Sequence, residues 1–220
     1  MLKVADAVTQ VIQNDQTALE SFREGILNLS AYAEKIHPSI EKLVYKNVKK
    51  GTIIVALSRL SKTSLKSGLL KPNIQIDHLN TRFPLTSFTY QKTFDTQRRV
   101  ATLNPYLVTP ADLFGIMEGE TEIVIICSEK AVDLIKDHIG VIPKRETSGL
   151  VAITVQFPEN LNLTPNVLYA LLSTLAVHKI SVVNILPTLD EISFIIEKNH
   201  LEQAISAFNM YTLKEKHESK

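Results

Sequence analysis

The sequence contains no tryptophan and one cysteine, Cys127, among its 220 residues. A single cysteine cannot form a disulfide within the chain. No apolar run approaches the roughly 20 residues that a membrane-spanning helix needs. The N-terminal stretch MLKVADAVTQ lacks the apolar core of a secretory signal peptide. Together these absences predict a cytoplasmic protein.

Sequence signatures of catalysis are also missing. No histidine stands beside a cysteine or an acidic residue at a recognised metal-binding spacing, and there is no G-x-S-x-G motif and no glycine-rich phosphate loop. Cys127 belongs to an apolar run expected to be a buried strand, so we interpret it as a small core residue rather than a nucleophile. We therefore expect no enzyme activity, no cofactor and no metal. An enzyme whose catalytic residues are scattered along the sequence is the less favoured alternative.

Charge is distributed unevenly along the chain. Residues 1–72 contain 11 Lys/Arg and 6 Asp/Glu, whereas the remainder contains 13 and 17, which together give the overall net charge of +1. Residues 42–71 include eight basic side chains and no acidic one. Such a cluster favours an anionic partner, although a solvated helical surface has the same composition.

The first 66 residues are expected to form helices, because apolar side chains recur there at steps of three or four residues. The dipeptide His37-Pro38 predicts an interruption, with Pro38 in the first turn of a further short helix that ends at Val44. The last helix of this segment is expected from Gly51 to about Lys62.

That last helix is predicted to have one polar, basic face. Thr52, Val55, Arg59, Lys62 and Lys66 recur at steps of three or four and would form a single stripe. Several helices with a basic one at the end are typical of a helix-turn-helix or winged-helix domain, but a helical dimerisation arm has the same outline. DNA is therefore a candidate partner, with these expected contacts: Lys49, Lys50, Arg59, Lys62 and Lys66.

After a linker expected at residues 67–75, strands and helices alternate. Helices are predicted at Ala131–Ile139, from Thr164 as N-cap with Pro165 in the first turn, and through Leu201–Phe208. The predicted strands are Pro84–Thr93, Leu113–Met117, Glu122–Cys127, Leu150–Phe157, Ile180–Leu186, Glu191–Ile196 and an edge strand at Tyr211–Lys214.

Part of this pattern is repeated. The segment EIVII at Glu122–Ile126 matches EISFI at Glu191–Ile195, at an offset of 69 residues. The same offset places Leu113–Met117 on Val182–Leu186. Each copy therefore contains strand, strand and helix in the same order.

The second copy adds a preceding strand and helix and the edge strand, which gives the ferredoxin-like order β-α-β-β-α-β. In the first copy the irregular residues 95–110 take the place of the preceding helix. The expected fold class is α+β, with an N-terminal helical, winged-helix-like domain over residues 1–70. A degenerate ferredoxin-like module over residues 74–145 and a complete one over residues 149–214 follow.

The C-terminal module resembles an ACT domain, and the pair of modules resembles the tandem ACT domains of aspartokinases. The resemblance rests on Leu150–Phe208, with the segments VAITVQFP, TPNVLYALLSTLAVHKI, SVVNIL and EISFIIEKNHLEQAISAF. The kinase domain of that family is absent. The helical segment NLSAYAEKIHPSIEKLV is similar to the N-terminal part of small uncharacterised prokaryotic ACT proteins.

The resemblance implies that an amino acid or similar metabolite binds where the first strand passes into the first helix. A helix start offers unpaired backbone N–H groups to a carboxylate. Many ACT domains have glycine after the loop proline, where this chain has Asn166. The expected ligand-binding residues are Gln156, Pro158, Asn160, Asn162, Thr164, Asn166, Val183, Asn184 and Ile185.

Two interpretations of function remain open from the sequence. In the first, the chain is an allosteric, amino-acid-responsive regulator of transcription or metabolism, and it forms a homodimer through the ACT sheets. In the second, the ACT modules serve only for dimerisation or protein–protein interaction and bind no ligand.

Overall fold

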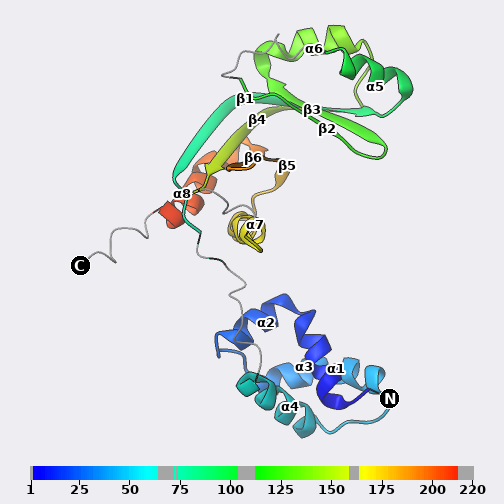
Figure 1. Cartoon of the computed structure of the whole chain (residues 1–220), viewed down its shortest axis with the longest axis vertical. Helices are drawn as coiled ribbons and strands as arrows, with labels where there is room; N and C mark the ends of the chain where they lie inside the picture. The colour runs from blue at the N-terminus through cyan, green and yellow to red at the C-terminus, as the bar shows by residue number, and fades with distance from the viewer. Residues whose placement is uncertain (1, 64–71, 73, 104–111, 159–163, 213–220) are drawn as a thin grey trace, which may run out of the picture. The chain divides into compact units, whose positions relative to one another are not determined.

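The computed structural model describes residues 2–63, 72, 74–103, 112–158 and 164–212 (Figure 1). It divides into two compact units, unit 1 over Met1–Leu70 and unit 2 over Lys71–Lys220. Among the described helices, none combines the length and apolar character needed to cross a membrane.

The described part of unit 1 consists of four helices. They are α1 (Val4–Gln13), α2 (Gln16–Arg23), α3 (Leu29–Val44) and α4 (Lys50–Thr63). The side chain of Asp15 caps α2, and that of Asn28 caps α3, by accepting hydrogen bonds from backbone N–H groups of the first turn. All four helices bury apolar side chains in one core, which includes Ile12, Phe22, Ile40, Ile53 and Leu57.

Helix α3 continues through Pro38, so the predicted interruption at this proline is wrong. Pro38 is exposed, and the carbonyl group that loses its helical N–H partner can therefore bond to water. Ile36, Ile40 and Val44 continue the buried stripe past the proline at four-residue steps. The residues described in unit 1 include no strand and therefore no wing, so the winged-helix-like domain stays a prediction.

Unit 2 is built on one antiparallel sheet of six strands in the order β2-β3-β1-β4-β6-β5. The α+β class is thereby confirmed. The strands are β1 (His78–Gln91), β2 (Gly115–Glu118), β3 (Glu122–Ser128), β4 (Arg145–Gln156), β5 (Val182–Pro187) and β6 (Glu191–Glu197).

Two pairs of helices cover the sheet (Figure 1). Helices α5 (Phe94–Ala101) and α6 (Val132–Ile139) pack on β1 and β3, whereas α7 (Val167–Val177) and α8 (Leu201–Thr212) pack on β4 and β6. A short 3₁₀ helix precedes α6 and another precedes α8, namely η2 (Glu129–Ala131) and η4 (Lys198–His200). The two halves of unit 2 thus repeat the same order of elements.

The long strands β1 and β4 belong to both halves. Residues 85–91 of β1 pair with β3, while residues 78–82 pair with residues 152–156 of β4. The early residues of β4 in turn pair with β1, and residues 150–156 pair with β6. Each half therefore takes its fourth strand from the other, and the two predicted modules share one continuous sheet.

Two further expectations are corrected. Residues 95–101 belong to helix α5, so the first copy keeps its first helix instead of an irregular segment; residues 104–111 lie outside the described residues. Tyr211 and Thr212 end helix α8 and form no edge strand, and residues 213 and 214 lie outside the description. The physical reason is that β4 already pairs with β1 on one side and β6 on the other.

The structure also extends the repeat to β1 and β4. Leu85 pairs with Ser128, and Leu150 pairs with Glu197, so Leu85 and Leu150 are equivalent. This alignment also matches Gln91 with Gln156, at an offset of 65 residues instead of 69. Because the offset changes within the copy, a search at one fixed spacing misses the similarity of these two strands.

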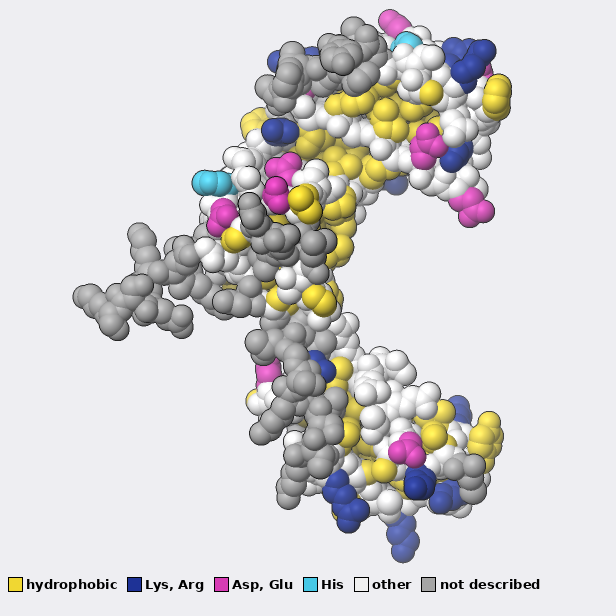
Figure 2. Space-filling view, in the orientation of Figure 1, with side chains coloured by type: hydrophobic (Ala, Val, Ile, Leu, Met, Phe, Trp, Pro, Cys, Tyr) yellow, Lys and Arg dark blue, Asp and Glu magenta, His cyan; other side chains and the backbone are white. Residues whose placement is uncertain are grey.

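The faces of the two halves that carry no helices turn toward each other. Leu85, Ile126, Leu150 and Ile195 form a buried cluster there. Strands β2 and β5 stand at opposite ends of the strand order, yet Gly115 of β2 lies close to Leu186 of β5. A Cβ atom added to Gly115 would be only 3.2 Å from Leu186 Cδ1. The sheet is therefore curled, and Figure 2 shows hydrophobic side chains along its hollow side.

Candidate ligand-binding site and basic surface

The predicted ligand site lies where β4 leads into α7. Gln156 and Pro158 are half-buried at the end of β4, and Thr164 and Asn166 are exposed before α7. Asn160 and Asn162 lie outside the described residues. The backbone carbonyl of Gln156 accepts a hydrogen bond from the N–H of Asp77 at 3.0 Å, so its side chain is the part that can face a ligand.

Asn166, not Thr164, is the N-cap of α7, so the prediction for Thr164 is corrected. Asn166 has φ +72°, the left-handed conformation that glycine adopts at lowest cost and that asparagine tolerates better than most residues. This position therefore has the backbone that a glycine would adopt, although it carries a side chain. The Asn166 side chain makes no capping hydrogen bond.

The equivalent corner of the first half is closed by its own side chains. At the start of α5, Thr93 Oγ1 accepts from the Thr96 N–H at 3.1 Å, and the Thr93 N–H donates to Thr96 Oγ1 at 2.8 Å. This capping box occupies backbone donors that a ligand would need. Of the two related corners, the one at α7 is therefore the better suited to bind an anion.

The three predicted residues of β5 do not lie at this corner. Val183 stands in a bulge between Val182 and Asn184, which pair with Ile196 and Ile195. Because Gln156 pairs with Glu191, Asn184 is four residues along the sheet from Gln156, or about 14 Å. Ile185, one residue nearer, pairs with Phe194 in the middle of β6.

The turn between β5 and β6 lies at the corner instead. The N–H of Phe157 donates to the carbonyl of Asp190 at 2.9 Å. Phe157, Val167 and Ile192 belong to one buried cluster, so the start of α7 and this turn lie at the same end of the sheet. In a β-α-β-β-α-β fold, β4 and β5 run parallel, so the ends of both strands lie at the same edge of the sheet. This rule indicates that the end of β5, not its start, lies near the end of β4.

The predicted basic contacts of unit 1 are partly described. Lys49 and Lys50 are exposed at the start of α4, and Lys50 forms an ion pair with Glu34. Arg59 is exposed on α4. The side chain of Lys62 and the whole of Lys66 lie outside the description.

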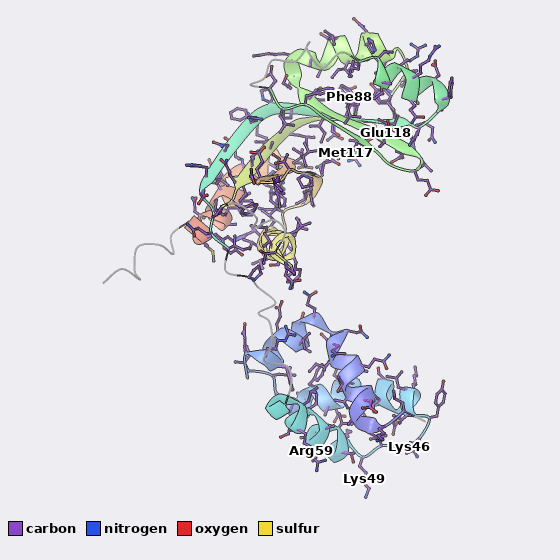
Figure 3. All side chains as sticks on the ribbon, viewed as in Figure 1. Lys46, Lys49, Arg59, Phe88, Met117 and Glu118 are labelled. Carbon is purple, nitrogen blue, oxygen red and sulfur yellow. The ribbon has the colours of Figure 1, made fainter. Side chains whose placement is uncertain are left out.

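The predicted stripe on α4 lines a groove. Thr52, Val55 and Arg59 form one wall, and residues of α1 including Val4 and Thr9 form the other, around a volume of about 280 Å³. Lys46, which is not among the DNA contacts predicted from the sequence, is also exposed. Figure 3 shows Lys46, Lys49 and Arg59 along the same lower edge of unit 1 in this view, and Figure 2 shows basic side chains (dark blue) there.

The described residues contain no group of three or more His, Cys, Asp or Glu side chains that could hold a metal ion. Cys127 is completely buried in the core beneath α5 and α6. Burial disfavours the thiolate and raises the pKa of Cys127 to about 12. A neutral, inaccessible thiol is a poor nucleophile, which supports the interpretation of Cys127 as a core residue.

No protein-family model and no curated protein matches the chain. Among solved structures, the ligand-free regulatory subunit of aspartate kinase from Thermus thermophilus matches with a TM-score of 0.52 and 12% identity. The match covers 62% of this chain and 98% of that subunit. Aspartate kinase from Clostridium acetobutylicum matches with a TM-score of 0.51 and 12% identity over 63% of this chain and 35% of that enzyme.

Aspartokinase III of E. coli, solved in complex with aspartate and ADP, gives a TM-score of 0.50 at 11% identity over 63% of this chain and 34% of that enzyme. The chain thus spans about a third of these two complete enzymes, but nearly the whole of the Thermus regulatory subunit. Because unit 1 ends at Leu70, the matched part must come largely from unit 2. Unit 2 therefore has the fold of aspartate kinase regulatory subunits, an ACT-type regulatory fold, and the resemblance noted from the sequence is confirmed.

Proposed function

We propose that unit 2 binds an amino acid as a regulatory effector, and that the chain is a regulatory protein of amino-acid metabolism rather than an enzyme. One observation carries this proposal: unit 2 reproduces nearly the complete fold of a subunit whose role is regulation of aspartate kinase. The complex of E. coli aspartokinase III with aspartate supports an amino acid as the class of ligand.

The binding site that we propose is the corner between β4, α7 and the β5–β6 turn. The start of α7 would bind the ligand carboxylate, since Asn166 leaves it without a side-chain cap and the helix dipole favours an anion there. The exposed carboxylate of Asp190 would bind the ammonium group from the turn. Gln156 and Thr164 would supply further hydrogen bonds, and Val183, Asn184 and Ile185 would not contact this ligand.

Calorimetric titration of the full chain with each of the twenty amino acids tests the proposal. The variant Asn166→Asp keeps a residue that caps helices well but places a negative charge against the ligand carboxylate, so affinity should fall at least about tenfold. Asn184→Asp makes the same change on β5, about 14 Å along the sheet from Gln156, and should leave binding unchanged. Absence of heat with every amino acid would refute ligand binding and favour a module used only for dimerisation or protein interaction.

We further propose that unit 2 forms a homodimer through one end of its sheet. The described strands β2 and β5 are edge strands, each paired on one side only. Edge strands present unpaired backbone groups that a second copy can satisfy. Sedimentation velocity of the full chain should show a dimer, and a monomer at all concentrations would contradict this assignment.

A second candidate function, binding of DNA by unit 1, is favoured by the exposed side chains of Lys46, Lys49 and Arg59 on one edge of the unit. Retardation of random duplex DNA at low salt is expected, and it should weaken steeply as salt is added, because phosphate contacts release counterions. Lys49→Gln should weaken binding and lower the salt dependence. Lys35→Gln is the matched control, because the Lys35 ammonium is paired with Asp15 at 2.8 Å. Failure to retard DNA at low salt would refute this function.

A further inference from the structure

Unit 2 contains a cavity of about 230 Å³ that is separate from the α7 corner. It is lined by Arg82, Phe83 and Leu85 of β1, by Asp112 and Leu113, and by Ser128 at the end of β3. Leu85 pairs with Leu150, which is six residues along β4 from Gln156, so the Leu85 side of the cavity lies about 20 Å along the sheet from the end of β4.

A bulge in β1 opens this cavity. The pairs between β1 and β4 pass from Arg82–Ala152 directly to Leu85–Leu150, so Phe83 and Pro84 together lie opposite the single residue Val151. Bulges redirect the neighbouring side chains and are common next to binding sites. Here the bulge lets Arg82 and Leu85, which would otherwise continue one regular strand, line the same hollow.

Ser128 supplies a buried polar group that has no partner. Its side chain is 9% exposed, and its Oγ makes no hydrogen bond to any described residue. Although Ser128 directly precedes η2, its hydroxyl does not cap that helix. Buried hydroxyl groups are rarely left without a hydrogen bond, so a molecule bound in the cavity beside Ser128 would supply the missing partner of its Oγ.

The charges around the cavity are of opposite sign. The guanidinium of Arg82 suits a carboxylate, and the carboxylate of Asp112 suits an ammonium group. The remaining walls include the apolar side chains of Phe83, Leu85 and Leu113. At about 30 Å³ for each water molecule, the volume equals that of about eight waters, which fits a small metabolite.

We propose that this cavity is a second effector site, which binds a small α-amino acid through both of its charged groups. Arg82 binds the carboxylate, Asp112 binds the ammonium group, and Ser128 completes the hydrogen bonds. The inference rests on the proposed function, because it assigns a second site for the same class of effector in unit 2.

The repeat supports one such site in each chain. The residue equivalent to Ser128 in the second half is Glu197, because these two residues pair with the equivalent Leu85 and Leu150. Glu197 is exposed, whereas Ser128 is buried. The second half thus lacks the buried hydroxyl, and the pair of sites per chain consists of this cavity and the α7 corner.

Calorimetry of the full chain with glycine, alanine and serine tests the cavity. Two molecules should bind to each chain, and Arg82→Gln or Asp112→Asn should weaken one of the two binding events at least tenfold. Ser128→Ala should weaken the same event several-fold. The matched control is Arg98→Gln, which removes an exposed cation of α5 that pairs with Asp95, and it should change neither event.

The possible results separate the two sites. If Asn166→Asp removes all binding while the three cavity variants bind normally, the cavity proposal is overturned and the α7 corner stands. If the wild-type chain binds none of the twenty amino acids, both proposals fail. The carboxamide derivative of the amino acid that binds lacks the carboxylate, so it should not displace that amino acid from the cavity. Displacement with equal affinity would overturn the role of Arg82. This measurement uses the wild-type chain, so it does not depend on the folding of a variant.

Discussion

Replacing Phe88 by alanine should destabilise both halves of unit 2, not only the half that contains this residue. Phe88 is fully buried between the sheet and helices α5 and α6 (Figure 3). Truncation of such a side chain typically costs about 3–5 kcal/mol, through lost burial and the cavity left behind. Because β1 supplies a strand to each half, loosening it also removes the fourth strand of the half that contains α7 and α8.

The same reasoning applies in reverse to Phe208 of α8. It is fully buried against Phe194, with ring centroids 5.5 Å apart. For a unit of this size, each 1 kcal/mol lowers the melting temperature by about 2–4 °C. Phe88→Ala and Phe208→Ala should therefore each lower the melting temperature of unit 2 by about 6–20 °C.

Hydrogen exchange followed by mass spectrometry can assign the loss to each half. In both variants, peptides from β2–β3 and from β5–β6 should lose protection together. Phe94→Ala is the control, since Phe94 is 85% exposed, and it should change stability by less than about 0.5 kcal/mol. If Phe88→Ala accelerates exchange only in α5, β2, β3 and α6, the halves fold independently and the argument from shared strands is refuted.

Four further predictions concern single features of the fold. The Asp15 carboxylate accepts hydrogen bonds from Lys35 and from the first turn of α2, which lowers its pKa from 3.8. The stability that the ionised carboxylate gives to unit 1 is therefore fully present above pH 3.8 and is lost as the pH falls through the lowered pKa. Asp15→Ala should cost unit 1 about 1 kcal/mol of unfolding free energy in urea at pH 7, and progressively less under acidic conditions. Pro38→Ala should restore a helical hydrogen bond in α3 and raise the urea midpoint of unit 1 by the equivalent of about 1–3 kcal/mol, and a lower midpoint would contradict the continuous helix. Thr154 and Ser193 share a buried hydrogen bond of 2.7 Å; Thr154→Val and Ser193→Ala should each cost about 1–3 kcal/mol, and the double variant should cost less than their sum, whereas additive losses would show that the two hydroxyls are not coupled. The pKa of about 12 and the burial of Cys127 predict that iodoacetamide at pH 8 labels the thiol only after unfolding, and rapid labelling of the native chain would be inconsistent with the core assignment.

The repeat was the most informative part of the sequence. Glu122–Ile126 and Glu191–Ile195 do form equivalent strands, β3 and β6, because a short run of apolar, largely β-branched residues favours a buried strand from local sequence alone. The helical periodicity of the first residues was equally informative. Pro38 was misread because the rule that a proline ends a helix does not take account of where its freed carbonyl points.

The candidate site was predicted only in part. A polar loop before α7 and a turn at Pro187–Asp190 are predicted from the sequence, but the position of this turn beside the end of β4 is not. Val183 and Asn184 lie at a different level of the sheet from the end of β4, and sequence order does not show the level at which two strands pair. The cavity beside Ser128 has no sequence signature, since Arg82, Asp112 and Ser128 come together only through the pairing of β3 with both β1 and β2.

The amino-acid sequence alone therefore determined the types of most elements, the division between a helical part and an alternating part, and the ACT-type character of unit 2. These properties depend on side-chain patterns within a few residues. The tertiary structure alone decided that β1 and β4 serve both halves, which corner of the sheet is open at a helix start, and where opposite charges meet in a cavity. Those outcomes depend on pairing between residues up to 78 positions apart, such as His78 and Gln156, whose register is set by the packing of the whole sheet.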